Sequence, residues 1–502
     1  MDHQVQSKDL KKKIYGSIIA FLCIVVAISV VVNPEFIDYY YMKATGDYLL
    51  KNGSFNVNPF TVNDLGIITQ QWLYCIWISI VDKGGQVAVF CTVIMYLTLF
   101  LGAIMLYIKL HKLDVYKAFA VFFTAVIVSG GYLVRIRPET LSIILLILQI
   151  VVMEKAYISK KVGYLYILPI IMLVEINIHG SVWFVHYLII LAYTFPNLLK
   201  KYTIDNQING KGIGKHLCIA SFIMAAVMFI NPYGLKMITY TLLTMKNKVF
   251  SYIIISETQK PYALSFMAGM VYILIAIMVY GILNKALRIS SIYLAAGFSL
   301  MTLMMGRNLM FLILGYIVVS TDILKYLFEV KKFKIEFEVK KRDLLLFRLA
   351  VVAFALIFIS TFYDEVIVKK WDTKFSYSKI VDYIDEHYEK DDPIYAVTQV
   401  GSYFEYRGYN NIYTDSRPEI YTKSINGKKD VLKEYDKFGQ GILNVDVKSI
   451  SSKSFEEYIN GYGFKCFVVT KYESALYYYL ILSDKYEVTI SEKGAYLFEK
   501  CK

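Results

Sequence analysis

The feature that most constrains this chain is a series of long apolar runs that occupies residues 1–363. Several runs approach the roughly 20 residues that a helix needs to cross the core of a bilayer. Hydrophobic residues make up 57% of the 502 residues and charged residues only 19%, a balance that excludes a set of ordinary soluble domains. We therefore expect a polytopic α-helical membrane domain over 1–363 and a soluble domain over 364–502.

The apolar runs predict about eleven transmembrane helices, several of them short. Their expected bounds are 14–32, 86–108, 118–133, 141–153, 164–177, 182–196, 216–230, 262–282, 290–305, 309–328 and 344–362. Polar turns at 135–139 and 177–180 divide runs that would otherwise merge into single helices. Two long outer loops are expected, at 33–85 and 231–261.

The placement of lysine and arginine predicts the orientation of these helices. With the N-terminus inside, the inner loops hold more than twice as many of these residues as the outer loops. We expect a multi-pass protein of the cell (plasma) membrane, with a cytoplasmic N-terminus and residues 364–502 extracytoplasmic. This topology accounts for the net charge of +13, so a nucleic-acid partner is not expected.

Ionisable residues collect at the expected outer ends of the helices. Asp38 follows the first span, and a carboxylate at the membrane boundary is costly unless it has a partner or a function. Arg135, Arg137 and Arg307 lie at outer turns, against the general trend for basic residues. The guanidinium fork suits a bound phosphate, although contact with lipid headgroups explains these arginines equally well.

A polar cluster interrupts the apolar sequence near residue 177. Glu175 and His179 are four residues apart and share one face of a helix, with Asn177 between them. Such a cluster inside an apolar run indicates function, and a purely structural role stays open.

The two long outer loops supply further candidates for substrate binding, namely Gln71, Trp72 and Glu257. The apolar stretch from Gln71 to about Val81 is too short to span a membrane, so we expect it to be re-entrant or interfacial. The three tyrosines at 39–41 are typical of an aromatic belt at the membrane surface.

Residues 364–502 alternate between helical and strand patterns, which indicates an α/β domain with some parallel pairing. Helices are expected at 376–389, 428–437, 453–460 and 474–483. Strands are expected at 394–398, 412–414, 466–470, 486–490 and 495–499. Asp415 and Arg417 lie just past a strand end, where ligands often bind, but they are also placed to pair with each other.

Several short motifs together resemble those of one family. They are Asp38 after the first span, Gly46–Leu50, Gln71–Leu73, Arg137–Glu139, Asn177–Gly180, Asn231–Gly234 and Tyr413–Glu419. On these motifs the chain resembles the GT-C superfamily of integral-membrane glycosyltransferases, and most of all its bacterial members with an extracytoplasmic α/β tail. The resemblance implies a donor sugar linked to polyprenyl phosphate and a catalytic acidic residue at Asp38. Many members carry a second acidic residue where this chain has Tyr39, so a divalent metal cofactor is left open.

We therefore expect an enzyme that moves a sugar, with inversion, to a glycan, lipid or protein acceptor in assembly or modification of a cell-envelope polysaccharide. Such a reaction needs a base for the acceptor hydroxyl and cations for the departing phosphate. Asp38 fits the base, the three outer arginines fit the phosphate, and His179 with Glu175 can assist. A polymerase or ligase of lipid-linked glycans, a transporter and a non-catalytic envelope scaffold remain alternatives. A transporter places its charges near the bilayer midplane, whereas these lie at the outer rim.

Overall fold

The computed structural model describes most of the chain. The described residues are 24, 37–53, 56–62, 64–114, 117–118, 120–121, 124–125, 135–194, 213–246, 260–332, 341–364, 377–396, 398–440 and 452–501. The expected spans 14–32 and 118–133 fall largely outside these residues, and so does Glu257.

The chain forms two compact units that are each built from three separate segments. Unit 1 comprises Met1–Pro34, Val87–Ile230 and Ser256–Lys369. Unit 2 comprises Glu35–Gln86, Asn231–Ile255 and Lys370–Lys502. Most residues of the two predicted outer loops therefore belong to the same unit as the C-terminal segment.

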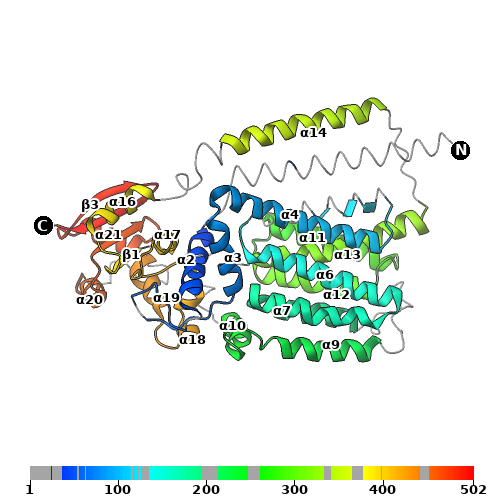
Figure 1. Ribbon diagram of the computed structural model, residues 1–502, viewed down its shortest axis with the longest axis horizontal. Coiled ribbons are helices and arrows are strands. Elements are labelled where there is room, and N and C mark those ends of the chain that lie inside the picture. Colours follow the sequence, from blue (N-terminus) through cyan, green and yellow to red (C-terminus); the bar gives the residue numbers. More distant parts are fainter. Residues whose placement is uncertain are drawn as a thin grey trace. The chain divides into compact units, whose positions relative to one another are not determined.

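Unit 1 is a bundle of apolar helices (Figure 1). Its α-helices are α4 (Gly85–Leu110), α6 (Pro138–Ser159), α7 (Leu168–Ile178), α8 (Trp183–Thr194), α9 (Ile213–Val227), α11 (Phe266–Leu283), α12 (Ile289–Met304), α13 (Leu309–Lys325) and α14 (Lys341–Phe362). Short 3-10 or π-helical turns adjoin some of them, at Val162–Ile167, Gly180–Val182, Gly306–Asn308 and Tyr326–Val330. Helix α12 packs against α8, α11 and α13, which places it inside the bundle.

Four helical segments among the described residues are long and apolar enough to cross a membrane, namely Gly85–Leu110, Pro138–Ser159, Phe266–Leu283 and Gly306–Val330. Shorter apolar helices of 10–17 residues accompany them. Each expected span that lies within the described residues coincides with one of these helices, with ends that differ by a few residues. The molecule is thus a multi-pass membrane protein, while the total of eleven crossings stays a prediction.

Unit 2 combines helices from three parts of the chain with one sheet. Its first two segments contribute α2 (Ile37–Asn52), α3 (Trp72–Asp82) and α10 (Leu235–Lys246). Its last segment contributes helices α16 (Ser378–His387), α17 (Thr398–Tyr406), α18 (Lys423–Asn426), α19 (Val431–Glu434), α20 (Ser452–Tyr462) and α21 (Ser474–Leu482), with 3-10 and π-helical turns at Pro418–Tyr421 and Tyr435–Gln440.

Within the described residues of unit 2, the sheet has four strands in the order β1-β2-β4-β3. They are β1 (Ile394–Ala396), β2 (Cys466–Thr470), β3 (Tyr486–Glu492) and β4 (Ala495–Lys500). Strand β1 pairs parallel with β2, and the other pairs are antiparallel, so the predicted α/β pattern with some parallel pairing is confirmed. The expected strand at 412–414 is reduced to isolated bridges from Ile412 to Thr61 and Ile394.

Helices α2 and α3 pack closely, because a Cβ atom at Gly46 would clash with the backbone carbonyl of Cys75. Helix α17 packs on α2, and the Tyr40 and Tyr403 rings meet edge to face with centroids 4.9 Å apart. Tyr39, Tyr40 and Tyr41 are therefore buried in protein. The expectation of an aromatic belt was wrong for these residues, since a second segment of the chain covers them.

Candidate functional site

Charged residues gather where α6 begins in unit 1. Glu139 lies in the first turn of α6, and Arg137 precedes that helix. Arg307, half exposed, points one guanidinium nitrogen to within 3.6 Å of a Glu139 carboxylate oxygen. Arg137 and His179 also lie close enough to interact electrostatically with Glu139. The structure thus brings together Arg137, Arg307 and His179, which lie at three separate polar turns in the sequence.

A buried hydrogen-bond network connects α6, α7 and α8 at the same site. The Ser142 hydroxyl donates to Glu175 at 2.6 Å and lies 2.9 Å from Nδ1 of His179. Nε2 of His186 lies 3.2 Å from the second oxygen of Glu175, and Ser181 contacts Nε2 of His179 at 3.1 Å. Glu175 and His179 therefore belong to one network, as their spacing predicted, and both imidazole nitrogens of His179 have neighbours that fix the ring.

Two other predicted residues of unit 1 lie beside this network. The Asn177 amide donates to the carbonyls of Leu173 and Ile230, at 2.8 and 2.9 Å, and so ties α7 to the end of α9. Arg135 is half-buried before α6. Their roles in binding substrate and phosphate stay predictions.

The remaining predicted residues lie in unit 2. Asp38 is in the first turn of α2 and is half-buried. Gln71 precedes α3 and is buried, with its amide donating to the Tyr41 hydroxyl, and Trp72 begins α3. Asp38 and the Arg137 group belong to different units, so the assignment of Asp38 as base and of the arginines to the phosphate stays a prediction.

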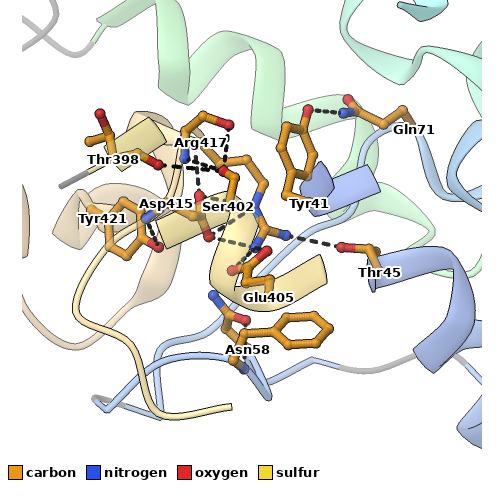
Figure 2. A network of polar contacts seen from close by, with 12 residues as sticks. Tyr41, Thr45, Asn58, Gln71, Thr398, Ser402, Glu405, Asp415, Arg417 and Tyr421 are labelled. Carbon is orange, nitrogen blue, oxygen red and sulfur yellow. Dashed lines mark hydrogen bonds and ion pairs between the residues drawn. The ribbon is translucent and has the colours of Figure 1, made fainter. Parts of the chain in front are cut away.

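The interior of unit 2 holds a second charged cluster, centred on Arg417 (Figure 2). The Arg417 Nε atom donates to both oxygens of Asp415 at 3.1 Å, and Nη2 contacts Asp415 at 2.5 Å and Glu405 at 3.0 Å. The guanidinium carbon lies 4.8 Å from the centre of the Tyr41 ring, within cation–π range. Nη1 reaches the Thr45 hydroxyl of α2 at 3.4 Å. The predicted pairing of Asp415 with Arg417 is thus present, and it extends to α2 and α17.

The pKa values of the two carboxyl groups in this cluster are shifted in opposite directions. Burial raises the pKa of Glu405 well above its usual range, and the neighbouring Asp415 carboxylate raises it further, against the opposing charge of Arg417. Burial would also raise the pKa of Asp415, but the Arg417 charge and several hydrogen bonds outweigh it and hold that pKa low. The Arg417 guanidinium therefore contacts one carboxyl group whose pKa is raised, Glu405, and one whose pKa is lowered, Asp415.

Backbone packing fixes the segment that carries this cluster. A Cβ at Gly401 would clash with the carbonyl oxygen of Thr414, so glycine lets α17 approach that segment. The Ser402 hydroxyl accepts a hydrogen bond from the Ser416 backbone at 3.0 Å, and the Tyr421 hydroxyl accepts one from the Asp415 backbone at 2.8 Å. These contacts fix the position of the backbone segment that carries Asp415.

A third polar network lies at the opposite end of α6. Arg288, before α12, lies 2.6 Å from Glu154 and 2.8 Å from Asp322 of α13. The Tyr193 hydroxyl of α8 donates to Glu154 at 2.7 Å. These groups join four helices, which fits a structural role.

The possibility of a divalent metal was tested on the donor groups. Among the described ranges, no three His, Cys, Asp or Glu side chains converge as a metal site would require. The described residues therefore do not fit a resident metal.

No protein-family model and no curated protein sequence matches this chain. Several solved structures have a similar fold. The oligosaccharyltransferase of Archaeoglobus fulgidus, tethered to an acceptor peptide containing an NVT sequon, is similar over 96% of this chain and 74% of its own, with a TM-score of 0.56 and 12% identity. The oligosaccharyltransferase AglB from Archaeoglobus fulgidus, in complex with an inhibitory peptide and a dolichol-phosphate, gives the same coverage and TM-score at 11% identity. A complex with Zn and sulfate covers 95% and 73%, with a TM-score of 0.53 and 12% identity.

This likeness shows the fold. The chain shares the fold of this oligosaccharyltransferase, helical in its apolar part and carrying a small C-terminal sheet, so the expected fold class is confirmed to that extent.

Several residues of these sites escaped the sequence analysis. Ser142 and His186 lie in apolar runs, where single polar residues carry little signal, although each is fully buried. Glu405 and Thr45 became visible only through their contacts with Arg417, which is 12 and 372 residues away. Burying an unpaired charge is costly, so the single Glu405 within an aromatic stretch was the available sequence signal for this charged cluster.

Proposed function

We propose that this protein is a membrane glycosyltransferase that moves a sugar from a polyprenyl-phosphate-linked donor to an extracytoplasmic acceptor in the cell envelope. The observation that carries the proposal is the likeness in fold, over 96% of the chain, to an oligosaccharyltransferase that was solved with a dolichol-phosphate and an inhibitory peptide. We also propose that the enzyme is of the bacterial type, that transfer inverts the anomeric centre, and that residues 364–502 lie outside the cell.

The proposed reaction gives each group a defined task. The Asp38 carboxylate accepts the proton of an acceptor hydroxyl, whose oxygen then forms a bond to the anomeric carbon of the donor sugar. The bond from that carbon to the phosphate oxygen breaks, and its electron pair leaves with the lipid phosphate. Attack opposite the departing phosphate inverts the anomeric centre.

Stabilising the departing phosphate falls to the arginines of unit 1. Arg137 and Arg307 gather around Glu139, and Arg307 is half exposed, so its guanidinium is accessible to a bound anion. Donors held in place before the reaction stabilise developing charge without reorganisation. Ser142 and Glu175 orient His179 beside these arginines.

Mass spectrometry of envelope glycans and lipid-linked sugars tests the proposal directly. Deleting the gene should remove one sugar from an envelope glycan and cause its polyprenyl-phosphate donor to accumulate. Wild-type protein should restore the glycan, and Asp38→Asn, which nearly keeps the side-chain size, should not. Asp64→Asn is the matched control, because Asp64 is exposed in the same unit and its positive φ suits asparagine. Unchanged glycans after deletion, or full rescue by Asp38→Asn, would contradict the proposal.

A further inference from the structure

Gln149 of α6 and His186 of α8 extend the buried network of Ser142, Glu175 and His179 further into the helices of unit 1. Nδ1 of His186 lies 2.5 Å from Oε1 of Gln149, and Nε2 of Gln149 donates to the His186 carbonyl at 2.9 Å. Both side chains are fully buried. Polar side chains among apolar helices are costly unless each has a partner, so the direction of every hydrogen bond in this network matters.

The contacts of Gln149 determine which nitrogen of His186 carries a proton. Since the amide nitrogen of Gln149 donates to the His186 carbonyl, its amide oxygen faces Nδ1 of His186. That oxygen can only accept, so Nδ1 is protonated. Nε2 of His186 lies 3.2 Å from Oε2 of Glu175, where two lone pairs would repel each other. We therefore assign one proton between Nε2 and Oε2, which leaves the His186–Glu175 pair without net charge.

This shared proton sets the direction of the remaining hydrogen bonds. A second proton, on Oε1 of Glu175, would give the fully buried pair a positive charge, which is costly. Oε1 therefore accepts, and the Ser142 hydroxyl donates to it at 2.6 Å rather than to the Pro138 carbonyl at 3.4 Å. With its one proton used, the Ser142 oxygen accepts from Nδ1 of His179 at 2.9 Å. Nε2 of a neutral His179 is then an acceptor.

Ser181 is the most exposed member of this network. It is half-buried, and its hydroxyl oxygen lies 3.1 Å from Nε2 of His179, the residue with which Arg307 interacts electrostatically. Because Nε2 accepts, Ser181 donates its one proton to it, and the Ser181 oxygen keeps lone pairs that can accept. A phosphate oxygen offers lone pairs, whereas a sugar offers O–H donors. Ser181 therefore suits a sugar hydroxyl and not the phosphate.

We propose that His186 is a positioning residue for recognition of the donor sugar. By holding a proton against Oε2 of Glu175, it makes Nε2 of His179 an acceptor, and Ser181 in turn accepts from a hydroxyl of the donor sugar. Gln149 holds His186 in the required orientation. This role rests on the proposed function, and it adds a group that contacts the sugar to the arginines that hold the phosphate.

Nitrogen-15 NMR identifies the protonated nitrogen of His179 directly. Full-length protein with labelled histidine is examined in lipid nanodiscs near neutral pH, and His179→Gln identifies the His179 signals among those of the six histidines. In the wild type, Nδ1 should carry the proton and Nε2 should not. His186→Phe removes the donor to Oε2 of Glu175, so this buried carboxyl group should take a proton and donate it to Ser142 through Oε1. The proton on His179 should then move to Nε2.

Two further variants serve as controls for the NMR experiment. His186→Gln is the conservative variant, since its amide nitrogen can replace Nε2 of histidine as the donor to Glu175. It should keep the wild-type tautomer of His179, and a changed tautomer would contradict the role of this hydrogen bond. His216→Gln is the matched control, because His216 contacts Tyr166 at 2.8 Å instead and should not affect the His179 signals.

A measurement in cells separates sugar recognition from a role in folding alone. In a strain without the gene, His186→Phe and Ser181→Ala should each restore roughly tenfold less envelope glycan than the wild type does. Polyprenyl phosphate, which lacks the sugar, should bind both variants in nanodiscs as tightly as it binds the wild type, because Arg137 and Arg307 are unchanged.

Four results would overturn the role of His186. They are a wild-type His179 protonated on Nε2 or on both nitrogens, a tautomer that His186→Phe leaves unchanged, full restoration of the glycan by Ser181→Ala, and weaker binding of polyprenyl phosphate to either variant. If the wild-type tautomer is wrong while Asp38→Asn still abolishes transfer, the proposed function stands without this role. If the tautomers are as expected while gene deletion changes no glycan, the hydrogen-bond directions stand and the transferase assignment fails.

Discussion

Arg417 contacts Asp415 through two guanidinium nitrogens, with the Asp415 carboxylate fully buried and Arg417 only 6% exposed. The same arginine reaches Thr45 in α2, so one side chain connects segments that are 372 residues apart in the sequence. The two-nitrogen contact depends on the planar fork of arginine.

Replacing Arg417 should destabilise unit 2 strongly. Arg417→Met leaves Asp415 buried without its cation, which costs about 3–5 kcal/mol. The midpoint of thermal unfolding of the purified full-length protein should fall by several degrees. Lys433→Met is the control, because Lys433 forms an exposed pair with Asp430 at 3.5 Å and should change the midpoint little. Equal midpoints for the two variants would show that the buried pair is not needed.

The stability of unit 2 should depend on pH through Glu405. Its pKa is raised in the folded state by burial, so the folded protein binds more protons than the unfolded chain at pH values above the usual glutamate range. Stability should therefore decrease as the pH rises from the usual glutamate pKa of about 4.3 towards the higher pKa of Glu405 in the folded protein. Glu405→Gln should flatten this dependence in thermal melts between pH 5 and 8. A slope that is identical in wild type and variant would exclude Glu405 as its source.

The contribution of Asp415 to stability should depend on pH with the opposite sign. Arg417 holds the pKa of Asp415 below its usual range, so this group contributes stability above the unfolded value of about 3.9 and loses it as the pH falls. Asp415→Asn should be less stable than the wild type at pH 7. The difference in stability between the two proteins should become smaller near pH 3. The measurement is the unfolding midpoint across that range.

Arg137 and Arg307 should bind the phosphate of a polyprenyl phosphate. Arg→Lys at either position removes the two-point contact and should weaken binding roughly tenfold, which corresponds to about 1.4 kcal/mol. Titration of polyprenyl phosphate into nanodisc-embedded protein measures this directly. Arg348→Lys, an exposed arginine of α14, serves as the matched control. Unchanged affinity in both variants would reject the assignment.

The predicted orientation can be tested by labelling in intact cells. In a background without native cysteines, exposed Ser424→Cys should react with an impermeant maleimide, since residues 364–502 are expected outside. Lys331→Cys, exposed after α13, should react only after the membrane is opened. Protection of Ser424→Cys in intact cells would invert the topology.

Local sequence patterns predicted many of the secondary-structure elements, because long apolar runs and short strand patterns are local signals. The expected strand 466–470 coincides with β2, and the expected helix 474–483 with α21. Helix α17 was missed, since its sequence contains Gly401 and several aromatic residues with modest helix propensity. Its packing on α2 supplies stability that propensity does not show.

The contacts of the candidate sites could likewise be predicted from the sequence only in part. The helical spacing of Glu175 and His179 predicted that they act together, and the structure joins them through Ser142. Contacts of Arg417 with Glu405 and Thr45 depend on tertiary structure that brings distant segments together, which no spacing rule encodes. The Glu154–Arg288–Asp322 network was missed for the same reason.

The division of unit 2 among three segments also sets the order in which the protein can mature. Residues 35–86 are synthesised long before residues 370–502, and at about 5–20 residues per second tens of seconds separate them. During that interval Tyr40 has no Tyr403 to pack against, and Thr45 has no Arg417. The ribosome must therefore finish residues 370–502 before residues 35–86 can complete their fold, so maturation of unit 2 waits for the last part of the chain to be synthesised.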